Sequence, residues 1–195
     1  MSLRIVLYPH PTLRHVSKPL RRVDADLRKM IDEMFDLMYE AQGVGLAANQ
    51  VDLPYRVFVA NVTGDPEQPD QQLVFINPVI TKRRGTAEAE EGCLSLPKLY
   101  GNVKRSEHVT ITAYNLAGEN VQYELQGLPA RVVQHELDHL DGVLFIDRLS
   151  ETGKLSVKRS LEDMEERLEV ARSRGDIPDD KAIAQRLVEL EKLRT

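Results

Sequence analysis

Residues 134–142 read Gln-His-Glu-Leu-Asp-His-Leu-Asp-Gly, and the fold is predicted to be built around this segment. Pro129 lies upstream at a position that suits the first turn of a helix, and Gly142 suits the residue after the last turn. The pattern therefore predicts a helix of about three turns. On such a helix His135 and His139 are four residues apart and share one face, where two imidazoles can bind a single metal ion.

The chemistry of this helix depends on Glu136 and on a third metal ligand. Glu136 is rotated by about 100° from its neighbour, so it can lie beside a metal and act on a water molecule there. A catalytic metal needs a third protein ligand and one open position. Metzincin peptidases place a third histidine downstream, where this chain has Phe145. Cys93 lies upstream instead, between Gly92 and Pro97 in backbone expected to be irregular, and a thiolate suits a borderline-soft divalent metal.

Composition excludes several classes of protein. The chain has 195 residues, enough for one domain with an appendage. It carries 26 Lys and Arg against 31 Asp and Glu, and this acidic balance disfavours binding to DNA or other nucleic acids. The single cysteine rules out an intramolecular disulfide and suits a reducing compartment. Neither a long apolar run nor a signal-peptide core is found, so we expect a cytoplasmic protein with no membrane span.

Charge density divides the chain near residue 150. Residues 151–195 hold 21 charged residues among 45 and no aromatic residue. Apolar residues recur at helical spacing from Leu155 to Ala171, and Gly175 and Pro178 then interrupt the pattern. A second apolar stripe consists of Ala182, Ile183, Leu187, Leu190 and Leu193. We therefore predict a catalytic domain over residues 1–150 and a charged C-terminal helical extension over residues 151–195.

The remaining body mixes helical and strand periodicities. Asp24 suits the N-cap of a helix that ends before Gly43 and carries an apolar stripe. Apolar patterns predict strands over residues 55–62, 73–80, 108–114 and 121–125, with a hairpin turn around Gly118. Because the strands follow one another with few helices between them, the sequence predicts an α+β fold. Antiparallel or mixed sheets are expected to surround the central His-Glu-x-x-His helix, with the C-terminal helical tail outside them.

Three segments together resemble the peptide deformylase family. They are Gly43-Val44-Gly45-Leu46-Ala47-Ala48-Asn49-Gln50, Glu91-Gly92-Cys93-Leu94-Ser95 and Gln134-His135-Glu136-Leu137-Asp138-His139. The resemblance implies that Cys93, His135 and His139 are the metal ligands and that Glu136 is the general acid and base. It also implies that the Gln50 side-chain amide and the Leu94 backbone N–H donate to the oxyanion. In many members an arginine follows the cysteine by seven residues, whereas this chain has Tyr100.

The reaction implied by the resemblance is hydrolysis of the formyl group from the N-terminal formylmethionine of new polypeptides, which releases formate. Val44 and Val132 are expected to hold the methionine side chain, with the stem of Arg131 at the edge. Main-chain groups of Gly45 and of the segment at Tyr100 are expected to pair with the peptide. Iron(II) is the implied native metal, and zinc, nickel or cobalt also suit the ligands. The helix that begins near Leu155 is a candidate docking element for the ribosome.

Two other hypotheses remain open from the residues alone. A zinc-type peptidase can use the same His-Glu-x-x-His helix, but it requires a third ligand downstream, where Phe145 counts against it. A ribosome-associated or peptide-binding module with a structural metal requires a fourth protein ligand. The presence of both Gln50 and Glu136 favours an enzyme over such a module.

Overall fold

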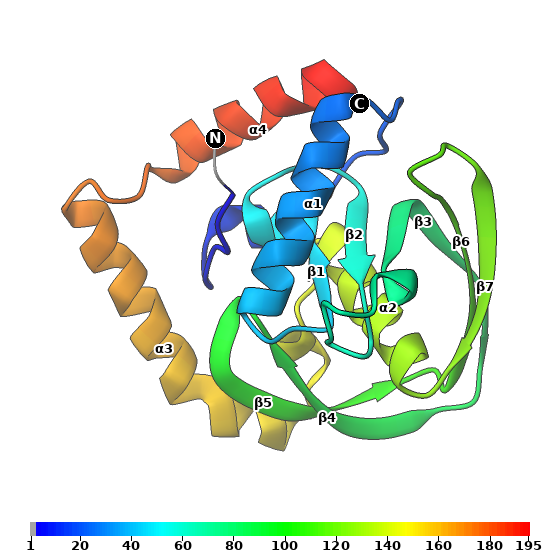
Figure 1. The fold of residues 1–195 in the computed structure, drawn as a ribbon. Helices are drawn as coiled ribbons and strands as arrows, with labels where there is room; N and C mark the ends of the chain where they lie inside the picture. The colour runs from blue at the N-terminus through cyan, green and yellow to red at the C-terminus, as the bar shows by residue number, and fades with distance from the viewer. Residues whose placement is uncertain (1–2) are drawn as a thin grey trace.

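A computed structural model describes residues 3–195. Its central sheet has five antiparallel strands in the order β1 (Gly45–Ala47), β2 (Val57–Ala60), β3 (Leu73–Arg84), β6 (His108–Tyr114) and β7 (Asn120–Gln126). A second sheet pairs β4 (Ala87–Cys93) with β5 (Leu96–Arg105). Figure 1 shows this hairpin curving beneath the central sheet. The α+β class predicted from the sequence is confirmed.

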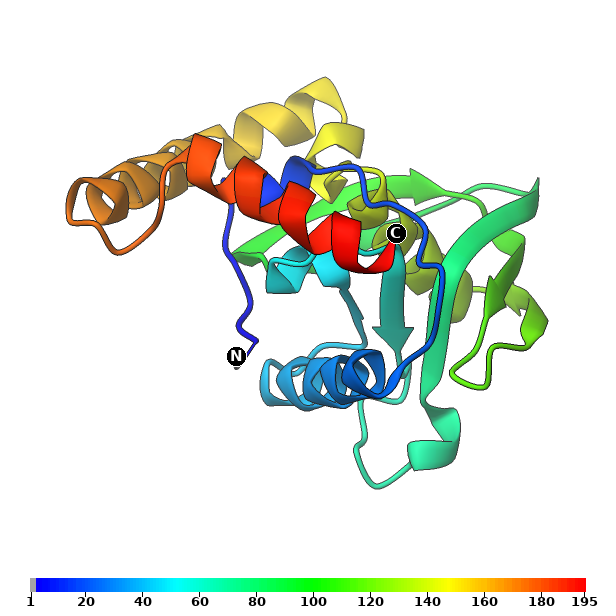
Figure 2. The same cartoon turned by 90° about the horizontal axis from the view of Figure 1, so that it is seen from above.

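Two helices cover opposite faces of the central sheet, as Figure 2 shows from above. They are α1 (Ala25–Glu40) and α2 (Leu128–Leu140). All four residues of β2 are buried, because alternate side chains of a strand point to opposite faces and both faces are covered. Val57 and Val59 pack toward α1, and Phe58 and Ala60 pack toward α2. The sheet is therefore the middle layer of three.

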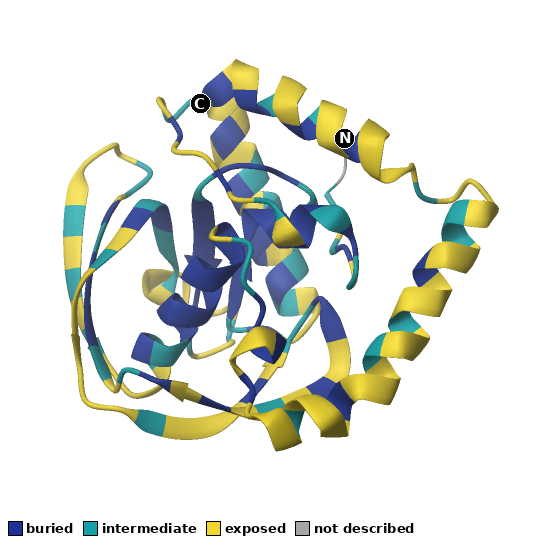
Figure 3. Cartoon of the chain, turned by 180° about the vertical axis from the view of Figure 1, so that it is seen from behind, coloured by how far each residue is buried: buried dark blue, intermediate teal, exposed yellow. Residues whose placement is uncertain are grey.

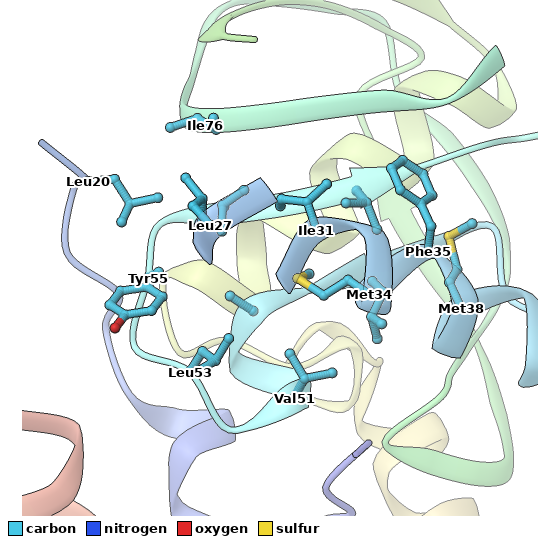
Figure 4. Packing of buried hydrophobic residues seen from close by; sticks show 14 residues of the cluster. Leu20, Leu27, Ile31, Met34, Phe35, Met38, Val51, Leu53, Tyr55 and Ile76 are labelled. Atoms are coloured by element: carbon cyan, nitrogen blue, oxygen red, sulfur yellow. The ribbon is translucent and has the colours of Figure 1, made fainter. Parts of the chain in front are cut away.

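The core between α1 and the sheet follows directly from the helical spacing of apolar residues. Asp24 is the N-cap of α1 and accepts a hydrogen bond of 2.9 Å from the Leu27 N–H. The buried face of α1 consists of Leu27, Ile31, Met34, Phe35 and Met38. Figure 4 shows these side chains meeting others from the sheet and from nearby loops. The predicted helix and its N-cap are thus confirmed.

A third cluster of apolar residues joins the hairpin to the C-terminal part of the chain. It includes Leu96 and Val103 of β5, Phe145 of the short helix η4 (Phe145–Arg148) and Val157 of α3 (Glu151–Ser173). Three further short 3₁₀ helices are η1 (Pro11–Arg14), η2 (Ala48–Val51) and η3 (Pro69–Gln71). Within residues 3–195, no helix is both long and apolar enough to cross a membrane.

The last helix, α4 (Asp180–Arg194), returns to the body and lies along the N-terminal segment. Glu191 is buried and binds both His15, at 2.8 Å, and Lys18, at 3.0 Å. Arg194 pairs with Asp24 at 2.5 Å, so the C-terminal helix is tied to the start of α1. In contrast, α3 is exposed along most of its length, as its mostly yellow ribbon in Figure 3 shows.

The structure corrects several details of the sequence prediction. The β4–β5 hairpin was not predicted, and Cys93 ends a strand, with a register shift between Gly92 and Cys93, rather than lying in irregular backbone. The acidic residues of β4 conceal the strand signal, because strand propensity reflects burial and this strand is mostly exposed. Strand β2 is shorter and β3 longer than predicted. In the tail Leu155 and Leu193 are exposed, although both were assigned to apolar stripes.

Replacement of Leu187 by alanine tests whether α4 stabilises the fold. Leu187 is 2% exposed, whereas its neighbour Val188 is 46% exposed. We expect Leu187→Ala to lower the free energy of unfolding by about 2–4 kcal/mol, because a buried leucine leaves a cavity. The matched Val188→Ala change is expected to cost less than about 0.5 kcal/mol. Urea denaturation measures both, and equal effects of the two changes would contradict the packing described for α4.

Candidate active site

A cleft of about 570 Å³ lies where α2, the segment around β1 and the β4–β5 hairpin meet. Residues from all three family motifs line it, together with Tyr100 of β5 and two residues in the N-terminal half of α2. The predicted site residues in this lining are Val44, Gly45, Gln50, Cys93, Leu94, Tyr100, Arg131, Val132, His135 and Glu136. His139 lies behind this lining and is buried. The structure therefore brings together every site residue that the sequence analysis named.

Helix α2 presents the two histidines on successive turns. Pro129 occupies the first turn, and Gly142, with φ +71°, follows the helix in the left-handed conformation that glycine adopts easily. The rings of His135 and His139 have centroids 5.0 Å apart. The predicted helix and the shared face of the two imidazoles are confirmed.

Cys93 supplies the third donor atom. Its Sγ lies 3.3 Å from Nε2 of His139. One donor atom each from Cys93, His135 and His139 can be chosen so that all lie within 4.8 Å of one another. Two imidazoles and a thiolate are ligands that suit zinc and other borderline-soft divalent metals. The three side chains therefore fit a divalent metal ion.

Glu91 orients His135, a role that the sequence did not predict. Oε2 of Glu91 lies 3.0 Å from Nδ1 of His135. An ionised carboxylate can only accept, so Nδ1 carries a proton and Nε2 is the ring nitrogen that remains for a metal ion. Histidines that bind a metal usually donate their other N–H to a carboxylate. The position of Glu91, two residues before the predicted ligand Cys93, was the one feature of the sequence that could have indicated this role.

The Glu91 carboxylate is also the centre of a buried ion-pair network. It accepts hydrogen bonds from Arg105 at 2.6 and 2.8 Å and from Arg131 at 2.6 Å. Arg105 also reaches Asp138 of α2 at 2.7 Å. Burial alone raises the pKa of Glu91, but hydrogen bonds from His135 and Arg105 outweigh it and hold this pKa at about 2. Glu91 is therefore ionised at neutral pH.

Glu136 differs from Glu91 because little compensates for its burial. Within residues 3–195, its Oε2 has no hydrogen-bond partner although it is buried. Burial raises the pKa of Glu136 to about 7, and the charges of His135 and Arg105 oppose this only in part. A Cβ atom at Gly45 would come within 2.5 Å of Glu136 Oε1, so the close approach requires glycine at this position. A carboxyl group with this pKa can both take up and release a proton near neutrality.

Gln50 is buried and its side chain is held in one orientation. Its Oε1 accepts a hydrogen bond of 2.9 Å from the Ala47 N–H, which leaves the amide Nε2 to face the site. Nε2 lies 3.4 Å from Cys93 Sγ and 3.4 Å from Ser95 Oγ. Leu94 follows the cysteine in the turn between β4 and β5, and its side chain packs on Gly43. Both predicted oxyanion donors thus lie beside the metal position.

The predicted peptide-binding residues form the outer part of the cleft. Arg131 is held by Glu91 and by the carbonyl oxygens of Val103 and Ala87, at 3.0 and 2.8 Å. Its guanidinium is therefore bound to the β4–β5 hairpin, and the aliphatic part of its side chain borders the cleft. Tyr100 is 61% exposed and lies over Gly92 at the mouth.

This geometry defines a class of protein: an α+β chain in which a His-Glu-x-x-His helix and a strand end offer two imidazoles and one thiolate to one divalent metal. A family model described as "Polypeptide deformylase" matches residues 2–155. The chain belongs to the polypeptide deformylase family, as the three sequence motifs predict. It is a hydrolase that acts in protein biosynthesis by removing the N-formyl group from new polypeptides, and the peptidase alternative is not favoured.

Curated relatives and solved structures agree with this assignment. A peptide deformylase of Rhodopirellula baltica is 50% identical over 195 residues, which is 100% of this chain and 96% of that protein. A peptide deformylase of Neisseria gonorrhoeae is 46% identical over 159 residues, or 82% of this chain and 93% of that protein. The structure of a Legionella pneumophila peptide deformylase has a TM-score of 0.78 and 39% identity, and it covers 87% of this chain and 98% of its own. Arabidopsis thaliana peptide deformylase 1B with an inhibitor has a TM-score of 0.84 and 38% identity, with 91% and 97% covered.

Replacement of Glu91 tests its effect on metal binding. We expect Glu91→Ala to weaken metal binding by about 10- to 100-fold, because His135 loses the acceptor that orients it. The variant also leaves Arg105 buried without its main partner, so the free energy of unfolding should fall by about 3–5 kcal/mol. Chelator competition followed by metal analysis measures the first effect, and denaturant unfolding measures the second.

Glu90→Ala is the matched control, because Glu90 is the exposed neighbour of Glu91 in β4 and lines the same cleft. It is expected to bind metal as the unchanged protein does. A folded Glu91→Ala protein with unchanged metal affinity would disprove the orienting role.

Proposed function

We propose that Cys93, His135 and His139 hold one divalent metal ion and that deformylation takes place beside it. The observation that carries this proposal is the convergence of the three donor atoms next to the buried, unpartnered carboxyl oxygen of Glu136. A divalent ion in this position supplies Lewis acidity, which makes water nucleophilic near neutral pH. We propose iron(II) as the native ion; zinc, nickel or cobalt also fit the ligand set.

Glu136 moves the proton in this scheme. It accepts a proton from the water that attacks the formyl carbon, and a new C–O bond forms. It then donates that proton to the amide nitrogen as the C–N bond breaks, and formate and a free amine result. The raised pKa of Glu136 supports both roles, since a general acid and base works best with a pKa near the working pH.

Gln50 and Leu94 stabilise the negative charge that develops on the formyl oxygen. The Gln50 Nε2–H and the Leu94 N–H are the two donors, and both belong to segments that are held before substrate binds. The hydrogen bond between Gln50 Oε1 and the Ala47 N–H supports this role, because it aims the amide without a rearrangement.

The outer cleft binds the methionine and the first peptide groups. Val44 and Val132 form the apolar slot, and the stem of Arg131 closes its edge. Strand β1 lies at the edge of the five-stranded sheet, so one side of its backbone at Gly45 is not paired with another strand of the described chain. We propose that the substrate backbone pairs there and with the segment at Tyr100, as an added strand.

Residues 1–150 form the catalytic domain in this proposal, and residues 151–195 form a helical extension. The ribosome is the proposed partner of α3, which is charged and exposed, whereas α4 is already engaged with the body. A cytoplasmic location is consistent with this role and with the need of Cys93 for a reducing environment.

Replacement of Glu136 tests the mechanism. We expect Glu136→Ala to lower kcat for formyl-Met-Ala-Ser by about 10²- to 10⁴-fold while metal content stays unchanged, because no other group moves the proton. Formate release and metal analysis are the two measurements. Cys93→Ser is the contrasting variant, and we expect it to lose metal. Retained turnover in Glu136→Ala, or release of peptides from unformylated casein without formate, would contradict the proposal.

Replacement of Gln50 tests the oxyanion donor separately. Gln50→Leu keeps the size of the side chain and removes the amide. We expect kcat to fall by about 10²- to 10³-fold with little change in KM, because the donor acts mainly on the transition state. Gln71→Leu, at an exposed site in η3, is the control and should leave both constants unchanged. A rise in KM with unchanged kcat would assign Gln50 to substrate binding instead.

A further inference from the structure

A second cavity of about 560 Å³ lies between α3 and the N-terminal segment, outside the cleft already described. Its apolar walls come from Val6 and Leu7 on one side and from Met164, Leu168 and Ile177 on the other. Leu7 is half exposed, whereas its neighbour Val6 is buried. The cavity therefore presents apolar surface on both walls, and we refer to it as the α3 groove.

The charged residues around the α3 groove are mostly basic. Arg4, Lys98 and Arg167 line it, and none of them forms an ion pair with any residue in the described range 3–195. The nearby carboxylate of Glu165 accepts a hydrogen bond of 2.8 Å from the Tyr8 hydroxyl. The groove therefore suits a ligand that combines apolar groups with negative charge.

His10 also lines the groove. Burial lowers the pKa of His10, and the charges of Arg186, Arg172 and Arg4 lower it further against the opposing effect of Asp52. The Asp52 carboxylate lies 3.9 Å from His10 Nδ1, so charges of both signs act on His10.

The α3 groove adjoins the active-site cleft. Pro97 and Lys98 line both cavities, and both residues are exposed. The N-terminal wall is joined to the same region: Tyr8 N–H donates to the Ser95 carbonyl oxygen at 2.9 Å, and Val6 N–H donates to the Gln50 carbonyl oxygen at 2.8 Å. A polypeptide that leaves the cleft over Pro97 and Lys98 therefore meets the groove at residues that the two cavities share.

We infer that the α3 groove binds the downstream part of the polypeptide substrate, with preference for a segment that carries apolar and acidic side chains. This inference rests on the proposed function, because the substrate is a long chain of which the cleft holds only the first residues. Arg167 and Arg4 would pair with the acidic side chains, and Met164 and Leu168 would contact the apolar ones. The helix α3 is then part of the substrate-binding surface.

The test compares formylated peptides of about three, six and nine residues, since each extended residue adds about 3.3 Å of reach. One nine-residue peptide carries leucine and glutamate in its distal half, and another carries serine and lysine. We expect kcat/KM for the leucine and glutamate peptide to exceed that for formyl-Met-Ala-Ser by about tenfold, because distal apolar burial and charge pairing lower KM. The serine and lysine peptide should show no gain.

Arg167→Glu is the decisive variant, and Arg159→Glu, at an exposed site on α3 that does not line the groove, is its matched control. Arg167→Glu should abolish the gain of the acidic peptide while formyl-Met-Ala-Ser is cleaved as before, and Arg159→Glu should change neither. Fluorescence anisotropy of the labelled, unformylated nine-residue peptides measures the same preference without turnover.

The outcomes separate the two proposals. Failure to cleave formyl-Met-Ala-Ser overturns the proposed function. The anisotropy measurement still shows whether the groove binds the leucine and glutamate peptide in preference to the serine and lysine peptide. A kcat/KM that does not depend on the distal residues, or a gain that persists in Arg167→Glu, overturns the groove as a substrate site. Loss of a dimer in Arg167→Glu, seen by sedimentation, would also overturn it and assign the surface to a second copy of the chain.

Discussion

The carboxylate of Glu91 is shared among Arg105 of β5 and Arg131 and His135 of α2, and this arrangement joins the hairpin to the central helix. Further polar contacts hold the hairpin on α2, since Arg105 also reaches Asp138 and Arg131 also donates to the carbonyl oxygens of Val103 and Ala87. Glu91 adds the contact that fixes the ring of His135. Arg105 is buried, and a buried cation that lacks a carboxylate partner strongly destabilises the fold. The relative position of the thiolate and the imidazoles therefore depends on this network, in which Glu91 is the central carboxylate.

The same network explains why two adjacent carboxyl groups behave differently. Glu91 is surrounded by donors and stays ionised, whereas Glu136 is buried with little compensation and titrates near neutrality. Glu91, which stays ionised, orients His135. Glu136, which can change its protonation state near neutral pH, is suited to carry a proton. The difference in hydrogen-bond partners is enough to separate these two roles.

Much of this arrangement follows from the sequence. The spacing of His135 and His139, the cap residues of α2 and the apolar stripe of α1 are local features, so they predict helices correctly. The β4–β5 hairpin and the role of Glu91 could not be obtained in this way. The strand signal of β4 is hidden by exposed glutamates, and the importance of Glu91 appears only when β5 and α2 bring Arg105 and His135 to it. The positions of the two helices in the tail could be predicted from periodicity. The burial of Glu191 and Arg194 could not, because it depends on their ion pairs with His15 and Asp24, which are far away in the sequence.

The contact between Gly45 and Glu136 has a consequence for inhibitors of this site. Any side chain at position 45 would come too close to the carboxyl group of Glu136, so substitutions there are expected to cost activity. A compound that takes its affinity from the Gly45 main chain would therefore leave few resistance mutations open at the residue it binds. Tyr100 is an exposed side chain at the mouth, so it can be replaced with less effect on the site. Resistance to compounds that bind mainly to Tyr100 is therefore expected to arise more easily.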